Sequence, residues 1–349
     1  MTALHNSFIG WGILAFSVFS VAWFLTGVLR RYALRADMLD RPNDRSSHSV
    51  PTPRGGGAAI VVTFLTGTSA LVLTDILSHS LGIALLAGGA TVALLGYVDD
   101  RRSVPARYRF SGHLAAATLL LLCMEPLPEV PMFGFSFELG WIGSALVLVF
   151  ITWSINLFNF MDGIDGIASV EAITVGLGGA LLWALTGTSS NWMAPALVAS
   201  ATAGFLIWNF PPARIFMGDT GSGFLGLMIA AFALWAGTER PSLFWAWLIL
   251  YGCFMVDATL TLVRRVSRGE KFHVAHRSHA YQYASRRLGS HRRVTLAIGA
   301  INVLWLLPIA ALVTLGFLDG LVGLSIGYVP LIGLALHFKA GDRQSQESG

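Results

Sequence analysis

The segment LGIALLAGGATVALLGYVDD, residues 81–100, is an apolar run that ends in two adjacent aspartates. A hydrocarbon core about 30 Å thick requires roughly 17 to 25 apolar residues per helix, so this segment predicts a membrane-spanning helix with an acidic end. The whole chain has the same character, with 54% hydrophobic and 12% charged residues and a mean hydropathy of +0.66. Soluble domains carry about 25% charged residues. The predicted fold class is therefore all-α, a polytopic membrane helix bundle.

Further apolar runs follow the same length rule and predict eleven spans in all. The shortest run, residues 111–124, leaves ten spans as the alternative count. Between two of the runs, residues 125–139 combine three prolines with an alternating FGFSFEL pattern, which favours a short surface hairpin. The predicted spans are 8–29, 57–77, 81–98, 111–124, 140–158, 167–187, 192–209, 220–237, 242–263, 294–316 and 320–338.

Basic residues set the predicted orientation of these spans. With eleven spans, 22 of the 23 Lys and Arg residues fall on one side of the membrane, and only Arg240 falls on the other. Because cytoplasmic loops are enriched in Lys and Arg, we expect a periplasmic N-terminus and a cytoplasmic C-terminus. The bias also explains the pI near 9.3 without nucleic acid as a partner. The basic loop at 264–293 is expected to contact anionic membrane lipids.

One continuous bundle is the predicted domain organisation, because no long polar insert separates the apolar runs. Residues 1–338 form a single integral membrane domain, and residues 339–349 form a short polar cytoplasmic tail. The first span has no small-residue cleavage site before Arg30, so it is read as retained. Cys123 and Cys253 lie inside apolar runs without CxxC spacing, which excludes disulfide and zinc frameworks.

Carboxylates gather on the predicted cytoplasmic side, at or near the ends of spans. Acidic residues in such positions are energetically costly and indicate function. Carboxylates from separate parts of the chain can meet around a cation, and hard oxygen ligands favour Mg²⁺, with Mn²⁺ as the alternative. The residues concerned are Asp99, Asp100, Asp162, Asp165, Asp219 and Asp257.

Two motifs contain most of these carboxylates. In NLFNFMDGIDGIAS, which starts at Asn156, polar residues recur at Asn159, Asp162 and Asp165, a spacing that predicts a shared helical face. In NFPPARIFMGDTGSGFLG, which starts at Asn209, glycines surround Asp219 at the start of a predicted span. A helix start of this kind offers backbone N–H groups to phosphate. The alternative is simple N-capping of that span by its own Asp or Thr.

Two basic loops complete the set of motifs. HVAHRSHAYQ, at residues 273–282, contains His276, Arg277 and His279, which suit diphosphate recognition. LDRPNDRSSHSVPTPRGGG, at residues 39–57, offers anion-binding candidates that include His48 and Arg54. For both loops the alternative is a basic surface loop without a site.

In this order, the motifs resemble the polyprenyl-phosphate N-acetylhexosamine-1-phosphate transferases of glycosyltransferase family 4. The resemblance covers roughly residues 40–285, and an ordered set of motifs is more specific than any one of them. It implies a bundle of ten or eleven spans in the bacterial inner membrane, with a cytoplasmic active site that requires Mg²⁺. The implied reaction joins undecaprenyl phosphate and a UDP-N-acetylhexosamine to give the diphospholipid-linked sugar and UMP. A homodimer is left open.

The resemblance also implies roles for individual residues. Asp99, Asp100 and His279 are expected to be catalytic, and Asp219 with Asp162 to bind the metal. The sequence HRSHAYQ resembles the branch that starts O-antigen or other surface polysaccharides in lipopolysaccharide biosynthesis, with UDP-FucNAc, UDP-QuiNAc or UDP-GlcNAc as the donor. The expected substrate-binding residues are Asn159, Asp165, Asn209, Phe216, Gly218, Ser222, His276, Arg277, Arg54 and His48.

Two other function classes compete with this interpretation. A polytopic transporter also has intramembrane carboxylates, but these should lie near the bilayer midplane rather than at one interface. A phosphatidyltransferase that uses CDP-alcohols would need a DGxxAR run, which the chain lacks. The transporter therefore remains the main alternative to the transferase.

Overall fold

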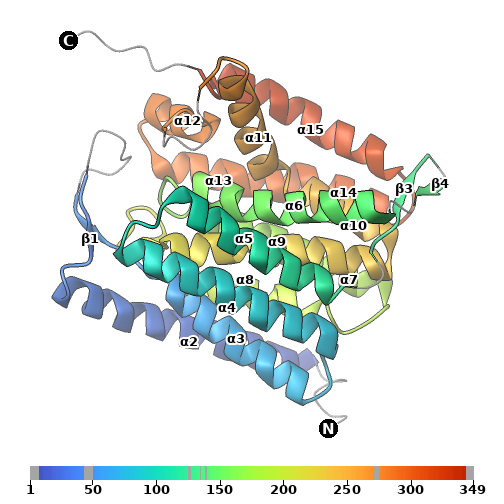
Figure 1. The fold of residues 1–349 in the computed structure, drawn as a ribbon, viewed down its shortest axis with the longest axis horizontal. Helices are drawn as coiled ribbons and strands as arrows, with labels where there is room; N and C mark the ends of the chain where they lie inside the picture. The colour runs from blue at the N-terminus through green and yellow to red at the C-terminus, as the bar shows by residue number, and fades with distance from the viewer. Residues whose placement is uncertain are drawn as a thin grey trace.

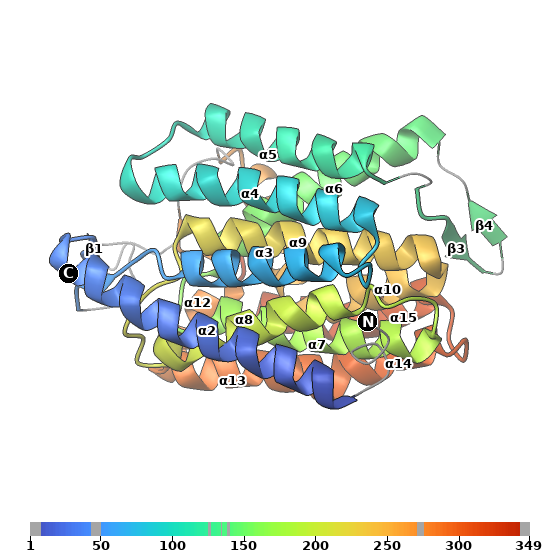
Figure 2. The same cartoon turned by 90° about the horizontal axis from the view of Figure 1, so that it is seen from below.

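The computed structural model describes residues 8–42, 50–124, 127–133, 135–137, 140–270 and 276–342. Most of these residues are helical, and the long helices run side by side along one direction (Figures 1 and 2). An all-α polytopic membrane bundle, the fold class that the sequence predicts, is therefore confirmed.

The chain forms the following helices: α2 (Phe8–Arg35), α3 (Gly57–Leu73), α4 (His79–Arg101), α5 (Ala106–Leu122), α6 (Gly140–Met161), α7 (Ile167–Thr186), α8 (Met193–Asn209), α9 (Asp219–Glu239), α10 (Pro241–Leu250), α11 (Gly252–Val266), α12 (Ala280–Leu288), α13 (His291–Ile301), the π-helix η1 (Asn302–Leu306), α14 (Leu307–Thr314) and α15 (Gly320–His337). Two antiparallel ribbons join them, β1 (Leu39–Asp40) with β2 (Thr52–Pro53) and β3 (Val130–Met132) with β4 (Phe135–Phe137).

Each predicted span coincides with helical structure, although two spans are not simple helices. The run 242–263 is broken into α10 and α11, which meet at 69°. The run 294–316 is divided between α13, η1 and α14. Within the described residues, seven helices are long and apolar enough to cross a membrane, or eight if α10 and α11 form one span, and α3 and α8 are shorter apolar helices. The eleven-span count and the orientation remain predictions.

Helix α9 forms the centre of the bundle. Its apolar window is entirely buried, and it packs against α4 and α6 on two sides and against α3 and α10 on others (Figure 2). Aromatic contacts join it to its neighbours, such as the ring pair Phe64–Phe224 at 5.6 Å between centroids. A helix that is apolar on every face is expected to be buried. The chain therefore offers Asp219, the first residue of α9, from the most enclosed element of the fold.

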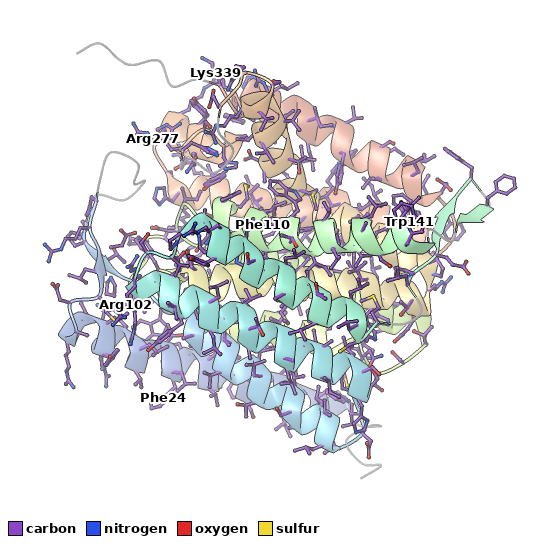
Figure 3. All side chains as sticks on the ribbon, viewed as in Figure 1. Phe24, Arg102, Phe110, Trp141, Arg277 and Lys339 are labelled. Carbon is purple, nitrogen blue, oxygen red and sulfur yellow. The ribbon has the colours of Figure 1, made fainter. Side chains whose placement is uncertain are left out.

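The two ends of the bundle differ in charge. Ribbon β1–β2 and α12 lie at one end, and the ribbon β3–β4 lies at the other (Figure 1). Arg102, Arg277 and Lys339 lie toward the first end and Trp141 toward the second (Figure 3). The predicted hairpin within 125–139 is confirmed by β3 and β4. Asp319 Oδ2 accepts a hydrogen bond of 2.9 Å from the backbone N–H of Phe133 and so ties this hairpin to α15.

At the hairpin end, the last residue of α9 fastens the loop between α7 and α8. The Glu239 carboxylate accepts hydrogen bonds from Trp183 Nε1 at 2.7 Å, from Ser189 Oγ at 2.8 Å and from Asn191 Nδ2 at 2.7 Å. Thr188 Oγ1 donates to it as well, at 2.7 Å. Because hydrogen bonds to charged groups are the stronger ones, this carboxylate holds both ends of the loop in place.

We expect Glu239→Gln to destabilise the bundle by about 1–3 kcal/mol, because the new amide N–H₂ faces donors and leaves them without an acceptor. Thermal unfolding in detergent measures the effect as a lower midpoint. Asp75→Asn serves as the control, because it removes the same charge from a carboxylate that is 82% exposed and lies 3.7 Å from His79 Nε2. Equal midpoints for the two variants would contradict the role of Glu239.

Candidate active site

The two aspartates at the end of α4 point in different directions. Successive residues on a helix are rotated by about 100°, so neighbouring carboxylates reach different surroundings. Asp99 Oδ1 accepts a hydrogen bond of 2.6 Å from the Val104 N–H, and its Oδ2 accepts one of 2.7 Å from Arg109 Nη1. Asp100 is 5% exposed and turns instead into the start of α9. The two carboxylates therefore contact different parts of the protein, and their catalytic roles stay predictions.

Asp219 is the centre of the polar cluster that Asp99 faces. Its Oδ1 accepts a hydrogen bond of 2.7 Å from Asn159 Nδ2, which also lies 3.0 Å from Ser222 Oγ. Its Oδ2 lies 3.7 Å from Arg109 Nη1, the guanidinium nitrogen that contacts Asp99. The Asp219 side chain is 36% exposed. One arginine thus links two carboxylates, one of which can still reach a ligand.

Asp162 adds further negative charge next to this cluster. It follows the last residue of α6, and burial, together with the charges of Asp219, Asp100 and Asp165, raises its pKa well above 3.8. A cation that bound between Asp162 and Asp219 would offset this repulsion.

The carboxylates here would suit a hard cation whose remaining coordination positions are filled by oxygen atoms of a substrate. Among the residues that the structure describes, no group of three or more His, Cys, Asp or Glu side chains could enclose a metal ion. Mg²⁺ is commonly held by one or two carboxylates together with substrate phosphates. Asp219 and Asp162 match that arrangement, and the assignment of both as metal ligands stays a prediction.

A cavity of about 370 Å³ leads away from the cluster. Its polar end contains Asp99, Arg109, Asn159 and Asp219, and its walls are mostly apolar side chains of α4, α5, α6 and α11. Wall residues such as Phe110 are also exposed on the outer surface, at 55%, and Figure 3 labels Phe110 on α5. The cavity therefore runs from a charged end to apolar residues on the outer surface, which the bilayer would cover. The apolar wall includes Phe110, Leu114, Leu148, Val149, Trp153, Phe160 and Leu262.

A second, basic cleft lies where α12, α13 and the loop after α8 meet. Its volume is about 570 Å³, and Arg277, Arg286, His291 and Arg292 line it. Asp165 lies here as well: its Oδ2 accepts a hydrogen bond of 3.0 Å from the Ala213 N–H, and its Oδ1 lies 3.2 Å from His291 Nδ1. The cleft carries the positive charge that a diphosphate requires.

The predicted shared face of Asn159, Asp162 and Asp165 is therefore wrong. Helix α6 ends at Met161, so the chain leaves the helix between the first and the other two residues. Asn159 contacts Asp219, whereas Asp165 bonds to the loop after α8 and to α13. The spacing of three was read as helical, although the glycines that follow end the helix.

The start of α9 offers fewer free N–H groups than a phosphate-binding helix start would, and phosphate binding there stays a prediction. The backbone N–H groups of Asp219 and Thr220 both donate to Asp100 and are not available to an anion. Gly218 is the N-cap residue, and no side chain of α9 itself caps it. Substrate contacts by Gly218 and Ser222 remain predictions. The N–H groups of Asp219 and Thr220 do not add to them, because both donate to Asp100.

The Asn209 side chain forms hydrogen bonds to other residues of the protein. Its Oδ1 accepts from the Gly166 N–H at 3.1 Å and from Ser169 Oγ at 3.3 Å, and its Nδ2 donates to the Ile215 carbonyl at 3.0 Å. The side chain is 3% exposed. Its role here is to join α7, α8 and the loop before α9, and its predicted substrate contact stays untested.

The loop at residues 53–57 lies along the segment before Asp219. The Phe216 N–H donates to the Pro53 carbonyl at 2.8 Å, and the Gly56 N–H donates to the Phe216 carbonyl at 2.9 Å. This pairing brings the backbone of Arg54 close to the loop that leads into α9. Contacts of Phe216 and Arg54 with a substrate remain predictions, and His48 lies outside the described residues.

His279 lies at the start of α12, 3% exposed, with its Nδ1 3.4 Å from Asp257 Oδ1. Asp257 also accepts backbone hydrogen bonds of 2.8 Å from Ala280 and 2.9 Å from Tyr281. The His276 and His279 ring centroids lie 4.9 Å apart, with the two rings tilted by 30°. The structure thus brings His276 and His279 together on a helix start that Asp257 holds.

Sequence reasoning missed several residues that contribute to this region. Arg109 links Asp99 to Asp219, although it was counted only as a topological charge. Asp257 was recognised as interfacial but not as the acceptor for α12. Glu171 was overlooked: it is fully buried and accepts a hydrogen bond of 2.7 Å from Asn302 Nδ2 on the π-helix. An acidic residue inside an apolar run was the signal that could have found Glu171.

Comparison with known proteins places these features in a family context. Residues 82–237 match the family described as Glycosyl transferase family 4. The chain is similar to a probable undecaprenyl-phosphate N-acetylglucosaminyl 1-phosphate transferase of Bacillus subtilis, with 32% identity over 293 residues, which cover 80% of this chain and 79% of that protein.

Two further relatives show the breadth of the similarity. A decaprenyl-phosphate N-acetylglucosaminephosphotransferase of Mycobacterium tuberculosis is 31% identical over 308 residues, covering 80% of this chain and 76% of the relative. A phospho-N-acetylmuramoyl-pentapeptide-transferase of Moorella thermoacetica is 33% identical over 229 residues, covering 60% of this chain and 70% of the relative.

The environment of His276 predicts a pH-dependent stability. Burial, aided by the charges of His279 and Arg265, lowers the pKa of His276 to about 3. Below about pH 6.5 the unfolded chain therefore binds a proton that the folded chain does not, so stability falls as the pH drops. We expect His276→Gln to make the thermal midpoint less sensitive to pH between 7 and 5. His79→Gln, at a side chain that is 67% exposed, should keep the wild-type slope, and an unchanged slope in His276→Gln would contradict the expectation.

Proposed function

Since the chain belongs to glycosyl transferase family 4, the polyprenyl-phosphate sugar phosphotransferases, we propose that it transfers an N-acetylhexosamine 1-phosphate from a UDP-sugar to undecaprenyl phosphate. The products are the undecaprenyl-diphosphate-linked sugar and UMP. The observation that carries this proposal is the cavity with a charged head and apolar walls, because a polyprenyl phosphate has the same two parts.

In this proposal the lipid acceptor occupies the cavity beside α5. Its apolar chain lies along Phe110, Leu114 and Val149, and its phosphate reaches Arg109. The guanidinium supplies positive charge and paired donors for phosphate oxygens. Arg109 already contacts Asp99 at 2.7 Å, so Asp99 fixes the arginine and, through it, the direction from which the phosphate approaches.

The UDP-sugar is assigned to the water-accessible basic side of the site. Arg277, Arg286 and Arg292 line the cleft of about 570 Å³ and match the charge of a diphosphate. Gln282 lines the same cleft, and its neighbour Tyr281 donates a hydrogen bond of 3.0 Å from its hydroxyl to the Phe160 carbonyl at the end of α6. Helix α12 is thereby fixed between the basic cleft and the acidic cluster.

The transfer itself requires positioning more than acid–base chemistry. An oxygen of the lipid phosphate forms a bond to the β-phosphorus of the UDP-sugar, the bond from that phosphorus to the bridging oxygen breaks, and UMP leaves with the electron pair. A phosphate monoester is largely ionised at pH 7, with a second pKa near 6, so Asp99 need only orient Arg109. Mg²⁺ held by Asp219 and Asp162 would neutralise the charge that develops on the diphosphate.

The proposal also covers the identity of the sugar donor and the cellular location of the enzyme. The names of the relatives described above specify N-acetylglucosamine or N-acetylmuramoyl-pentapeptide. The HRSHAYQ sequence here resembles the O-antigen-initiating branch, and that resemblance implies UDP-FucNAc, UDP-QuiNAc or UDP-GlcNAc as the donor. The enzyme would lie in the bacterial inner membrane with its site facing the cytoplasm and would start a surface polysaccharide such as O-antigen.

Release of UMP tests the proposal directly. Purified protein in detergent is supplied with labelled UDP-GlcNAc, UDP-FucNAc, UDP-QuiNAc or UDP-GalNAc, each with and without undecaprenyl phosphate. We expect UMP only when the lipid is present and with one or two of the sugars. Absence of lipid-dependent UMP with every sugar, together with uptake of substrate by proteoliposomes, would favour the transporter instead.

Metal removal and Asp219→Asn should give the same defect. EDTA is expected to abolish UMP release, and Mg²⁺ or Mn²⁺ to restore it. Asp219→Asn should lower the rate at saturating Mg²⁺ by about a hundredfold or more, because the site loses the charge that holds the cation. Asp37→Asn, on an exposed pair with Arg41, is the matched control. Activity of Asp219→Asn near wild type would remove the metal assignment.

A further inference from the structure

We propose that Asp100 is a positioning residue that fixes the start of α9, and that Asp99 alone of the pair faces the reacting groups. The role in transfer rests on the proposed function, whereas the contact itself does not. The family resemblance suggested a shared catalytic role for the two aspartates, but the structure separates their surroundings.

Both oxygens of Asp100 are used by the first turn of α9. The Asp219 N–H donates to Oδ1 at 2.9 Å, and the Thr220 N–H and Oγ1 donate to Oδ2 at 3.1 and 2.7 Å. The first N–H groups of a helix have no partner within that helix. Asp100 therefore supplies from α4 the acceptor that α9 lacks.

Two glycines allow the carboxylate to come this close. Gly218 has a φ of 75°, and a Cβ at this position would lie 2.7 Å from each Asp100 oxygen, nearer than real Cβ atoms approach. A Cβ on Gly96, one turn before Asp100 on α4, would overlap the backbone of Asp219. The backbones of α4 and α9 are therefore close together around Asp100, with no room for a side chain at either glycine.

The contact with Asp100 matters for the proposed reaction because it fixes Asp219, the proposed metal ligand. Asp219 is the first residue of α9, and its own N–H is one of the three donors to Asp100. Loss of the Asp100 carboxylate would let this turn fray and would move the Asp219 side chain relative to Asn159 and Arg109. Displacement of a ligand by about 1 Å is enough to cost about a hundredfold in rate.

A double-mutant cycle tests the contact without any assay of activity. Thr220→Val removes one donor to Asp100, and Thr220→Ser keeps it as the matched control. In thermal unfolding of the full-length protein in detergent with EDTA, we expect Thr220→Val to lower the midpoint in the wild type and to have little further effect in Asp100→Ala. If Asp100→Ala does not fold, Gly218→Ala, whose methyl group presses on the same carboxylate, takes its place.

A second measurement tests the positioning role. We expect Thr220→Val and Asp100→Asn to raise the Mg²⁺ concentration for half-maximal UMP release several-fold, and to reduce the Mg²⁺-dependent rise in the thermal midpoint. Asp99→Asn should lower the maximal rate without changing the Mg²⁺ requirement, because its carboxylate contacts Arg109 rather than the start of α9.

Two results would overturn the proposal. One is a loss of stability on Thr220→Val that is as large in Asp100→Ala as in the wild type. The other is an Asp100→Asn enzyme that loses turnover while it keeps the wild-type Mg²⁺ requirement, since that result would indicate direct participation in chemistry. A wild-type enzyme that releases no UMP would refute the proposed function, and the unfolding cycle would still decide the contact.

Discussion

A helix that begins inside a protein leaves its first N–H groups without acceptors, and the polar end of this bundle is organised around that constraint. Asp100 of α4 accepts from the start of α9, and Asp257 of α11 accepts from the start of α12. Each helix start carries an ionisable side chain, Asp219 in the first case and His279 in the second. Asp100 and Asp257 thus fix the positions of Asp219 and His279.

The described residues line two cavities of different character. One is lined mostly by apolar side chains and has Arg109 at its polar end, and the other is lined by arginines before α12, in its last turn and at the start of α13. A reaction between a lipid phosphate and a nucleotide sugar needs both kinds of space, since one substrate prefers the bilayer and the other prefers water. Asp219 lines the first of these spaces, and the charge of Asp219 reaches Asp162 nearby.

The apolar runs and the location of the acidic motifs could be predicted because span length and charge cost are local properties of the sequence. Side-chain partners could not. Asp99 and Asp100 are identical and adjacent, and only the position of α9 distinguishes them. Asn209 looked available for a ligand because its three partners are all distant in sequence or are backbone atoms. The break between α10 and α11 was missed because no charged residue interrupts the chain from 242 to 256, on either side of the bend.

The burial of α9 has a consequence for the order in which the protein is made. Most of the helices that enclose it, α3, α4 and α6 among them, precede it in the chain, so the walls are synthesised before the helix that fills them. Asp100 leaves the ribosome 119 residues ahead of the N–H group that it will accept from. A nascent chain that stops before α9 therefore has a hollow apolar interior and an unpaired carboxylate at its rim. Exposed apolar surface of this kind distinguishes unfinished chains from finished ones during biogenesis.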